Sequence, residues 1–211
     1  MIYEAVNLPV LSRVPPSAKR VLDLGCGAGT LGRHLKEKID CEVVGVTNAE
    51  AEYALATQIL DQVLMRDLNV FDPREAGKFD CIIGSHVLEH LYDPERLLKL
   101  LGQCLSPDGQ LLVALPNVLH WRQRLEFLSG RFRYTDGGLM DRTHYRFFDW
   151  STARQLLRES GYTILEAQAC GAFPLSRYLS WFGRKLDKAA LHNFPGLFGH
   201  QFLFVCRLAT S

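Results

Sequence analysis

The chain has 211 residues, of which 47% are apolar, and its formal net charge at pH 7 is +1. This length and composition suit one domain with a full hydrophobic core, and we expect residues 1–211 to form it. Because so small a net charge gives no field that attracts nucleic acid, we expect no nucleic-acid partner.

No apolar stretch approaches the about 18 residues of a membrane span, and the N-terminal residues lack the basic start of a secretory signal. We therefore expect no transmembrane segment, and peripheral contact with a membrane is disfavoured. The six cysteines are scattered without a C-x-x-C pair. This usage is typical of reduced, mostly buried thiols in a cytoplasmic protein.

Short apolar runs alternate with segments of helical periodicity along the whole chain. The runs predict seven strands, at residues 20–24, 41–47, 62–66, 79–85, 110–115, 162–168 and 201–208. Helices are predicted at 30–38, at 48–60 with Asn48 as the N-cap, from Asp93 onward, and at 151–160. A turn at 107–109 leads into the fifth strand. Such alternation indicates an α/β fold with a mostly parallel sheet.

The stretch R-V-L-D-L-G-C-G-A-G-T-L, residues 20–31, has the pattern of a buried strand, a tight turn and the start of a helix. Three alternate glycines, beginning at Gly25, permit positive φ angles and close approach of a ligand. Thr30 breaks the G-x-G-x-x-G fingerprint, which disfavours a nucleotide-sugar oxidoreductase. Asp23 precedes the first glycine by two residues, where a carboxylate favours a ligand with an amino group and a sulfonium over a pyrophosphate.

The sequence D-L-G-C-G-A-G at residues 23–29 resembles motif I of the class I S-adenosylmethionine-dependent methyltransferases. The nearest branch is that of small-molecule O-methyltransferases, which includes the ubiquinone-pathway enzymes. The resemblance covers nearly the whole chain. It implies a Rossmann-like sheet of seven strands with helices on both faces, in which the last strand lies antiparallel between the fifth and the sixth. It also implies S-adenosylmethionine as cofactor and S-adenosylhomocysteine as product.

In an open α/β sheet, ligands bind beyond the carboxyl ends of the strands. Thr47 stands where the family usually has an acid that binds both ribose hydroxyls, so that contact is expected to be weaker or shared with Asn48. Asp67 resembles the acid that accepts a hydrogen bond from the adenine amino group, and the end of the fourth strand faces the methionine moiety. The resemblance thus implies a cofactor site of Asp23, Gly25, Cys26, Gly27, Gly29, Thr47, Asn48, Asp67, Leu68, Ser85 and His86.

The segment S-H-V-L-E-H-L that begins at Ser85 lacks both the N/D-P-P-Y/F motif of amine methylation and a Pro-Cys nucleophile, which favours a hydroxyl acceptor. If this segment is helical, His86, Glu89 and His90 share one face. With His144 they resemble the metal ligands of RNA 2′-O-methyltransferases, and such a donor set favours zinc, iron or manganese over magnesium. Alternatively, Glu89 and His90 only fix the loop by hydrogen bonds.

A neutral imidazole suits removal of a hydroxyl proton, because its ordinary pKa is about 6.5. We expect His144 to be the general base, with His90 as the second candidate and Glu89 beside them. Most of the rate enhancement is expected to come from holding the acceptor and the cofactor in the geometry of attack.

Two segments are predicted as insertions into the sheet fold. Residues 117–148 carry six arginines and seven aromatic residues, which favours a substrate cap for an acidic, phosphorylated or sugar-like acceptor, although a plain helical cover remains an alternative. In residues 174–191, one helical face carries Leu175, Tyr178, Leu179, Phe182 and Leu186. The alternatives for this second insertion are completion of the pocket, packing on the domain, contact with a membrane and a homodimer contact. Packing on the domain is favoured.

The sequence therefore predicts a methyltransferase acting on a hydroxyl of a small molecule. The rival from another class is a non-catalytic S-adenosylmethionine-binding module that partners a glycan or metabolite assembly enzyme. Thr47 favours this rival, whereas the intact glycine turn and the segment around His144 favour the enzyme.

Overall fold

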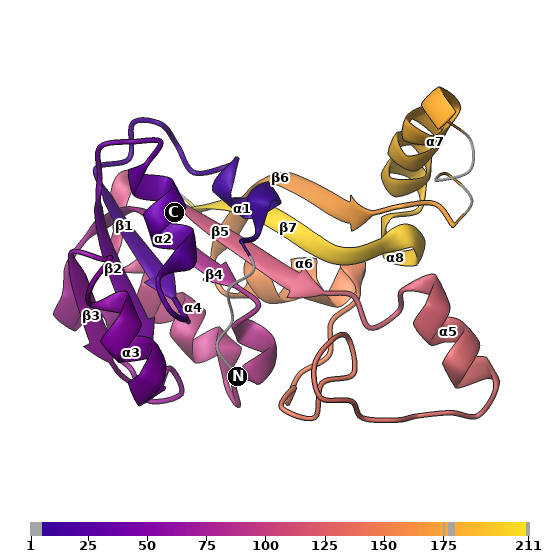
Figure 1. Ribbon diagram of the computed structural model, residues 1–211, viewed down its shortest axis with the longest axis horizontal. Coiled ribbons are helices and arrows are strands. Elements are labelled where there is room, and N and C mark those ends of the chain that lie inside the picture. Colours follow the sequence, from indigo (N-terminus) through magenta and orange to yellow (C-terminus); the bar gives the residue numbers. More distant parts are fainter. Residues whose placement is uncertain (1–5, 175, 177–179, 210–211) are drawn as a thin grey trace.

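The centre of the protein is a seven-stranded sheet with the order β3-β2-β1-β4-β5-β7-β6 (Figure 1). The computed structural model describes residues 6–174, 176 and 180–209. The strands are β1 (Arg20–Leu24), β2 (Glu42–Thr47), β3 (Gln62–Met65), β4 (Phe79–Ser85), β5 (Leu105–Pro116), β6 (Tyr162–Gly171) and β7 (Gly199–Leu208). Neighbouring strands are parallel except at β7, which is antiparallel to both β5 and β6. The predicted mostly parallel sheet, with its last strand antiparallel between the fifth and sixth, is confirmed.

Helices cover both faces of this sheet. Alternate residues of a strand point to opposite faces, so Leu22 and Leu24 of β1 belong to one hydrophobic core and Val21 to the other. The first core includes residues of α4 and α6, and the second includes residues of α1, α2 and α3. The described helices are α1 (Leu8–Leu11), α2 (Thr30–Lys36), α3 (Glu50–Ala56), α4 (Pro94–Gly102), α5 (Trp121–Leu128), α6 (Trp150–Glu159), α7 (Ser180–Asn193) and α8 (Pro195–Phe198), with 3-10 helices η1 (Pro73–Ala76) and η2 (Leu88–His90).

Several predicted element starts differ from the structure, and two of the differences have an identifiable cause. Asn48 does not cap α3, because the N-cap is Ala49, whose N–H donates to Thr47 Oγ1 at 3.2 Å. The fifth strand begins at Leu105 and not at Gln110, because Leu105 already pairs with Phe79. The predicted turn at 107–109 is an irregularity within β5, after which regular pairing resumes.

The caps of two other helices follow from their sequences. The side chain of Asp93 accepts a hydrogen bond from Arg96 N at 3.0 Å, which confirms the predicted start of α4. Asp149 and Thr152 form a capping box at the start of α6, one residue earlier than predicted. Both caps involve only residues within the first turn of their helices.

Residues 117–148, termed the cover segment below, leave the carboxyl end of β5, form α5 and return through a long loop to α6 (Figure 1). No residue of α5 is buried. Its loop is attached to the domain at η2, because the N–H groups of Tyr145 and Arg146 donate to Glu89 O at 2.8 and 3.0 Å. The cover segment therefore lies beyond the carboxyl ends of the strands, where the acceptor is expected.

The second insertion contains most of α7, which flanks β6 across a groove of about 820 Å³. Leu175, Tyr178 and Leu179 of the predicted apolar face lie outside the described residues. Of the other two, Phe182 is 59% exposed and Leu186 is half-buried. All six cysteines are free. In the ranges that the structure describes, no helix has the length and apolar character to cross a membrane.

Candidate functional site

Residues 25–29, termed the glycine loop, join β1 to α2 at the carboxyl edge of the sheet. Gly25, Gly27 and Gly29 have φ angles of 65°, 54° and 82°, in the left-handed region that favours glycine. A Cβ at Gly25 would lie 3.0 Å from Val87 Cγ2, so the loop lies directly against the segment after β4. The N–H of Cys26 donates to Val46 O at 2.9 Å and attaches the loop to β2. The predicted turn thus has the backbone that close approach of a ligand requires.

Asp23 lies at the start of this loop and is a buried carboxyl with an incomplete set of contacts. It is 3% exposed, and its Oδ2 has no hydrogen-bond partner among the described residues. Burial raises its pKa to about 7. Because a buried, unsatisfied acid is costly, the site fits a ligand that brings a cationic amino group to this position.

Thr47 and Asp67 occupy the neighbouring strand ends and have different surroundings. Thr47 is 4% exposed and donates its hydroxyl hydrogen to Glu52 Oε2 at 2.9 Å. Asp67 is exposed, and its Oδ1 accepts hydrogen bonds from the backbone and side chain of Asn69 at 2.9 and 3.0 Å. Leu68, which follows Asp67, is half-buried and packs on the core. Asp67 therefore retains Oδ2 for a ligand, whereas the hydroxyl of Thr47 already donates to Glu52.

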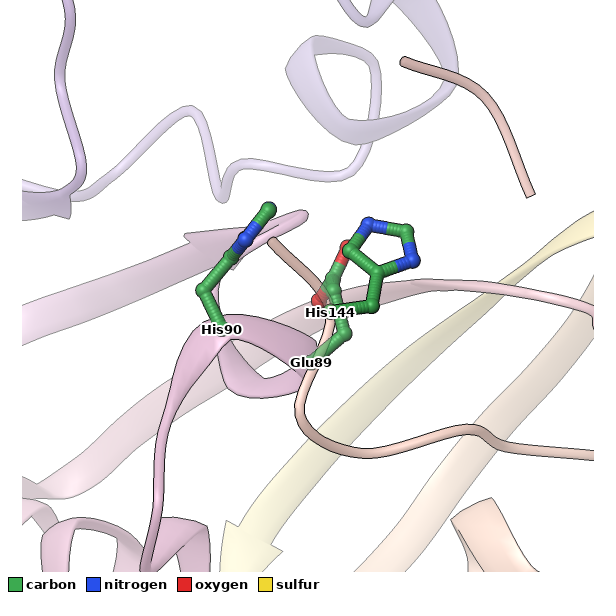
Figure 2. A group of neighbouring side chains, drawn as sticks. All are labelled: Glu89, His90 and His144. Atoms are coloured by element: carbon green, nitrogen blue, oxygen red, sulfur yellow. The ribbon is translucent and has the colours of Figure 1, made fainter. Parts of the chain in front are cut away.

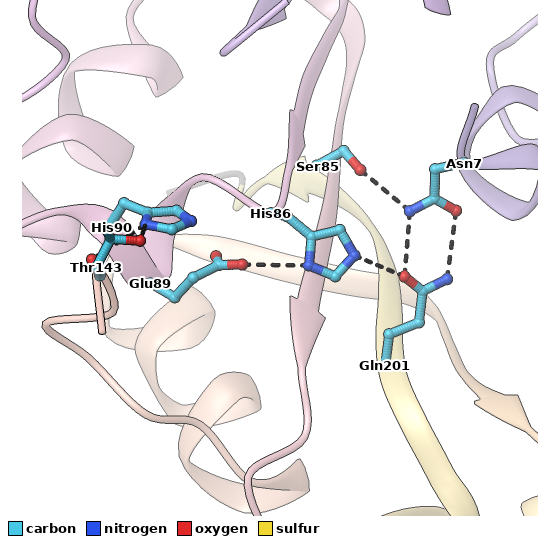
Figure 3. A network of polar contacts seen from close by, with 7 residues as sticks. All are labelled: Asn7, Ser85, His86, Glu89, His90, Thr143 and Gln201. Atoms are coloured by element: carbon cyan, nitrogen blue, oxygen red, sulfur yellow. Dashed lines mark hydrogen bonds and ion pairs between the residues drawn. The ribbon is translucent and has the colours of Figure 1, made fainter. Parts of the chain in front are cut away.

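The end of β4 is held by a network that reaches both ends of the chain (Figure 3). Ser85 Oγ accepts a hydrogen bond from Asn7 Nδ2 at 3.1 Å. His86 has a φ angle of 56°; its Nε2 donates to Gln201 Oε1 at 2.8 Å, and its Nδ1 lies 3.2 Å from Glu89 Oε1. Burial lowers the pKa of His86, but the contacts with Glu89 and then Gln201 outweigh it, and the net shift is upward. The contacts with Glu89 and Gln201 thus favour the protonated form of His86.

Glu89, His90 and His144 come together beside this network (Figure 2). One ligand atom of each lies within 4.8 Å of the others. Glu89 comes from η2 and is fully buried, and His144 comes from the cover segment and is 9% exposed. Glu89 Oε2 and His144 Nδ1 are buried without a hydrogen-bond partner among the described residues. Both atoms are thus available to a ligand, a proton or a metal ion.

The surroundings of the two histidines define what each ring can do. His90 Nδ1 lies 3.1 Å from the carbonyl oxygen of Thr143, which only accepts, so Nδ1 carries the hydrogen and Nε2 keeps a lone pair. The rings of His90 and His144 meet edge to face with centroids 4.7 Å apart. Burial, ahead of the opposing field of Glu89, lowers the pKa of His144. His144 is therefore neutral at pH 7 and can accept a proton.

His86 does not join this group, contrary to the predicted shared helical face. The helical segment is only the 3-10 turn η2, Leu88–His90, and His86 precedes it in a left-handed conformation. Both nitrogens of His86 face protein acceptors. Of the four predicted metal-ligating residues, the structure brings together Glu89, His90 and His144.

Sequence reasoning missed three polar side chains of the site, namely Glu52, Gln201 and Asn7. Gln201 is the third residue of β7, and its amide exchanges two hydrogen bonds with that of Asn7, at 3.2 and 3.3 Å. Neither residue lies within a motif, and 194 positions separate them. Glu52 carried a local signal, because its position in the first turn of α3 places it near the end of β2.

Most arginines of the cover segment have protein partners. Arg124 donates to Leu119 O at 2.6 Å, Arg142 pairs with Asp136 at 2.7 Å, and Arg146 donates to Tyr92 O at 2.6 Å. The guanidinium of Arg122 lies over the ring of Trp121. These contacts favour an ordering role for several of the arginines, as in the plain-cover alternative.

The fold and the glycine loop define an α/β protein with a cofactor site at the carboxyl edge of its sheet. A family model described as "Methyltransferase domain" matches residues 5–167, well over half of the chain. The chain belongs to this family, and the resemblance to class I S-adenosylmethionine-dependent methyltransferases is confirmed.

Two curated proteins and one solved structure illustrate the relationship. The chain is 35% identical over 112 residues to a trans-aconitate 2-methyltransferase of Variovorax paradoxus, covering 51% of this chain and 43% of that protein. It is 33% identical over 104 residues to a ubiquinone biosynthesis O-methyltransferase of Bradyrhizobium diazoefficiens, covering 46% and 40%. Each match thus spans less than half of the curated relative. A 1,6-didemethyltoxoflavin-N1-methyltransferase of Burkholderia thailandensis, solved with bound S-adenosylhomocysteine, shares the fold at TM-score 0.62 and 19% identity, over 98% of this chain and 80% of that one.

Proposed function

We propose that the protein is an S-adenosylmethionine-dependent methyltransferase that methylates a hydroxyl group of a small molecule. The observation that carries the proposal is the position of His144. Its ring lies beside Glu89 and His90, its buried Nδ1 has no partner among the described residues, and its segment is attached to η2. A neutral imidazole there can take the proton of a hydroxyl that the cover segment holds in place.

The cofactor supplies a methyl group on a positively charged sulfur. The glycine loop would let the backbone approach this ligand, Asp23 would face its amino group, and Asp67 would accept a hydrogen bond from its adenine. Ser85, at the end of β4, would lie against its methionine part. The orphaned Oδ2 of Asp23 and the absence of a Cβ at Gly25 support this fit.

Proton removal in this site depends on His144 and on the groups that surround it. Glu89 stabilises the imidazolium that forms when His144 accepts the proton, because its carboxylate raises the pKa of His144. His90 and Phe147 contact the His144 ring and hold its orientation. Positioning of acceptor and cofactor supplies most of the rate enhancement, since methyl transfer is an in-line displacement.

The same three side chains also fit a divalent metal ion. They offer one carboxylate oxygen and two imidazole nitrogens, a set that suits zinc, iron or manganese and leaves positions open for a substrate. The carbonyl of Thr143 holds His90 in the tautomer that leaves Nε2 free, as an outer partner of a metal ligand does. A bound ion would lower the pKa of an acceptor hydroxyl.

A metal-binding measurement decides between these two roles of the group. If the group is a metal site, calorimetry will detect about one equivalent of Zn²⁺ or Mn²⁺ per chain, and His90→Gln will weaken binding by about 10- to 100-fold. His34→Gln, on the exposed side of α2, serves as the control. Equal metal affinity in wild type and His90→Gln contradicts the metal role and leaves His144 as a base alone.

We propose that the acceptor is acidic, phosphorylated or sugar-like. The arginine-rich and aromatic composition of the cover segment supports this class. The non-catalytic alternative predicts cofactor binding without turnover. The test is transfer of a labelled methyl group from S-adenosylmethionine to a panel of hydroxy acids, sugar phosphates and phenols. Label on a hydroxyl oxygen supports the proposal, and label on nitrogen or carbon alone contradicts it.

A further inference from the structure

Glu52 is a half-buried carboxylate in the first turn of α3, beside the end of β2. Its Oε2 accepts a hydrogen bond from Thr47 Oγ1 at 2.9 Å. Within the described residues, Thr47 is its one hydrogen-bond partner, and no Lys, Arg or His forms an ion pair with it. Glu52 Oε1 is therefore open to a ligand.

The hydroxyl group of Thr47 is already hydrogen-bonded within the protein and is not available to bind both ribose hydroxyls. Its hydroxyl donates to Glu52 and accepts from the N–H of Ala49 at 3.2 Å, and its side chain is buried. One remaining lone pair cannot accept from two ribose hydroxyls. Thr47 instead holds the carboxylate of Glu52 and the start of α3 in fixed positions.

The position of Glu52 relative to the glycine loop supports a role in the cofactor site. Burial, then the charges of Asp23 and Glu52, raise the pKa of the Cys26 thiol. Geometry agrees with this, because a Cβ at Gly29 would lie 3.3 Å from Ala56 Cα in α3, and the N–H of Cys26 donates to Val46 O, next to Thr47. The N–H of Arg66, at the end of β3, donates to Thr47 O at 2.9 Å and brings the loop of Asp67 to the same edge.

We propose that Glu52, held by Thr47, accepts hydrogen bonds from the two ribose hydroxyls of S-adenosylmethionine. This inference rests on the proposed function and identifies the ribose-binding group of its cofactor site. A carboxylate matches a pair of adjacent hydroxyls, because it accepts two charge-assisted hydrogen bonds at once. The acid that the end of β2 lacks is thus supplied from α3, whereas Asn48 is exposed and uncharged.

The test is a binding cycle of two proteins with two ligands, measured by calorimetry. Wild type and Glu52→Gln are each titrated with S-adenosylhomocysteine and with its 2′-deoxy analogue. We expect Glu52→Gln to weaken S-adenosylhomocysteine binding by about 10- to 100-fold, as for a lost hydrogen bond to a charged group. The same substitution weakens the 2′-deoxy analogue by a clearly smaller factor, because one of the two hydroxyls is already absent.

Three control variants separate ribose recognition from general damage. Glu50→Gln changes an exposed acid in the same helical turn and leaves both affinities unchanged. Thr47→Val removes the hydroxyl that holds Glu52 and is expected to weaken S-adenosylhomocysteine binding. Thr47→Ser keeps a hydroxyl at this position and is expected to bind as the wild type does. Thermal melts of all variants report folding independently of binding.

The possible failures of this experiment are distinguishable. Equal loss for both ligands in Glu52→Gln, or no loss at all, overturns the ribose role while leaving the cofactor site in place. No binding of S-adenosylhomocysteine by the wild type overturns both the proposed function and this inference.

Discussion

Replacing His144 by Ala is expected to lower kcat by about 10²- to 10⁴-fold, which is the usual contribution of a general base. The affinity for S-adenosylhomocysteine should be unchanged, because His144 belongs to the cover segment and not to the glycine loop. A single-turnover assay with labelled S-adenosylmethionine measures the loss, and calorimetry measures the affinity. His34→Ala, which alters an exposed histidine of α2, is the matched control.

The pH profile of the wild type gives a second readout for this residue. Burial lowers the pKa of His144 below its ordinary value of 6.5. The rate should therefore fall as the pH drops through this lowered pKa and His144 becomes protonated, and it should be level near pH 7. A profile that keeps this inflection in His144→Ala, or a kcat within about threefold of wild type, contradicts the role of general base.

Replacing Asp23 by Asn is expected to weaken S-adenosylmethionine binding by about 10- to 100-fold, because the buried carboxylate loses its charge. In the wild type, affinity should rise as the pH increases through about 7, since Asp23 ionises in that range. The Asn variant should lose this dependence. Calorimetric titrations at several pH values test both expectations, with the exposed Asp108→Asn as the control.

The ionisation of Asp23 that favours cofactor binding should lower the stability of the ligand-free protein. The pKa of Asp23 is raised from 3.8 to about 7, so between these values the folded state holds a proton that the unfolded state has released. The stability of the ligand-free wild type therefore falls as the pH rises from about 4 to 7. Denaturant melts should show a smaller fall in Asp23→Asn. A fall of equal size in both proteins would show that another group is responsible.

Local sequence signals were sufficient for most of the sheet. The bounds of β1 and β4 were predicted correctly, because each is a continuous buried run that ends at glycine or a polar residue. The start of β5 was wrong, because the pairing of Leu105 with Phe79 is a long-range contact that a Pro-Asp-Gly signal hides. The antiparallel seventh strand came from the family resemblance and not from periodicity.

The candidate site was only partly predictable, since several of its contacts join distant parts of the chain. The motif gave Asp23 and the glycine loop, and the convergence of Glu89 and His90 with His144 matches the hypothesis of a shared group. The exclusion of His86 depends on its left-handed backbone and its contact with Gln201, and neither is visible in the sequence. The assigned roles of these residues stay predictions.

The fold by itself does not decide the reaction, because one scaffold can host different chemistry. The family match supports the proposal of methyl transfer, and buried atoms of Asp23, Glu89 and His144 without a partner among the described residues lie around one edge of the sheet. These atoms define where cofactor, proton and acceptor are expected to meet.

The most direct test of this account is a calorimetric titration of the purified protein with S-adenosylmethionine and S-adenosylhomocysteine, repeated with Asp23→Asn. The account predicts that the wild type binds both ligands with micromolar affinity and that the variant binds both much more weakly. Absence of binding to the wild type, or equal affinity in the variant, would contradict it.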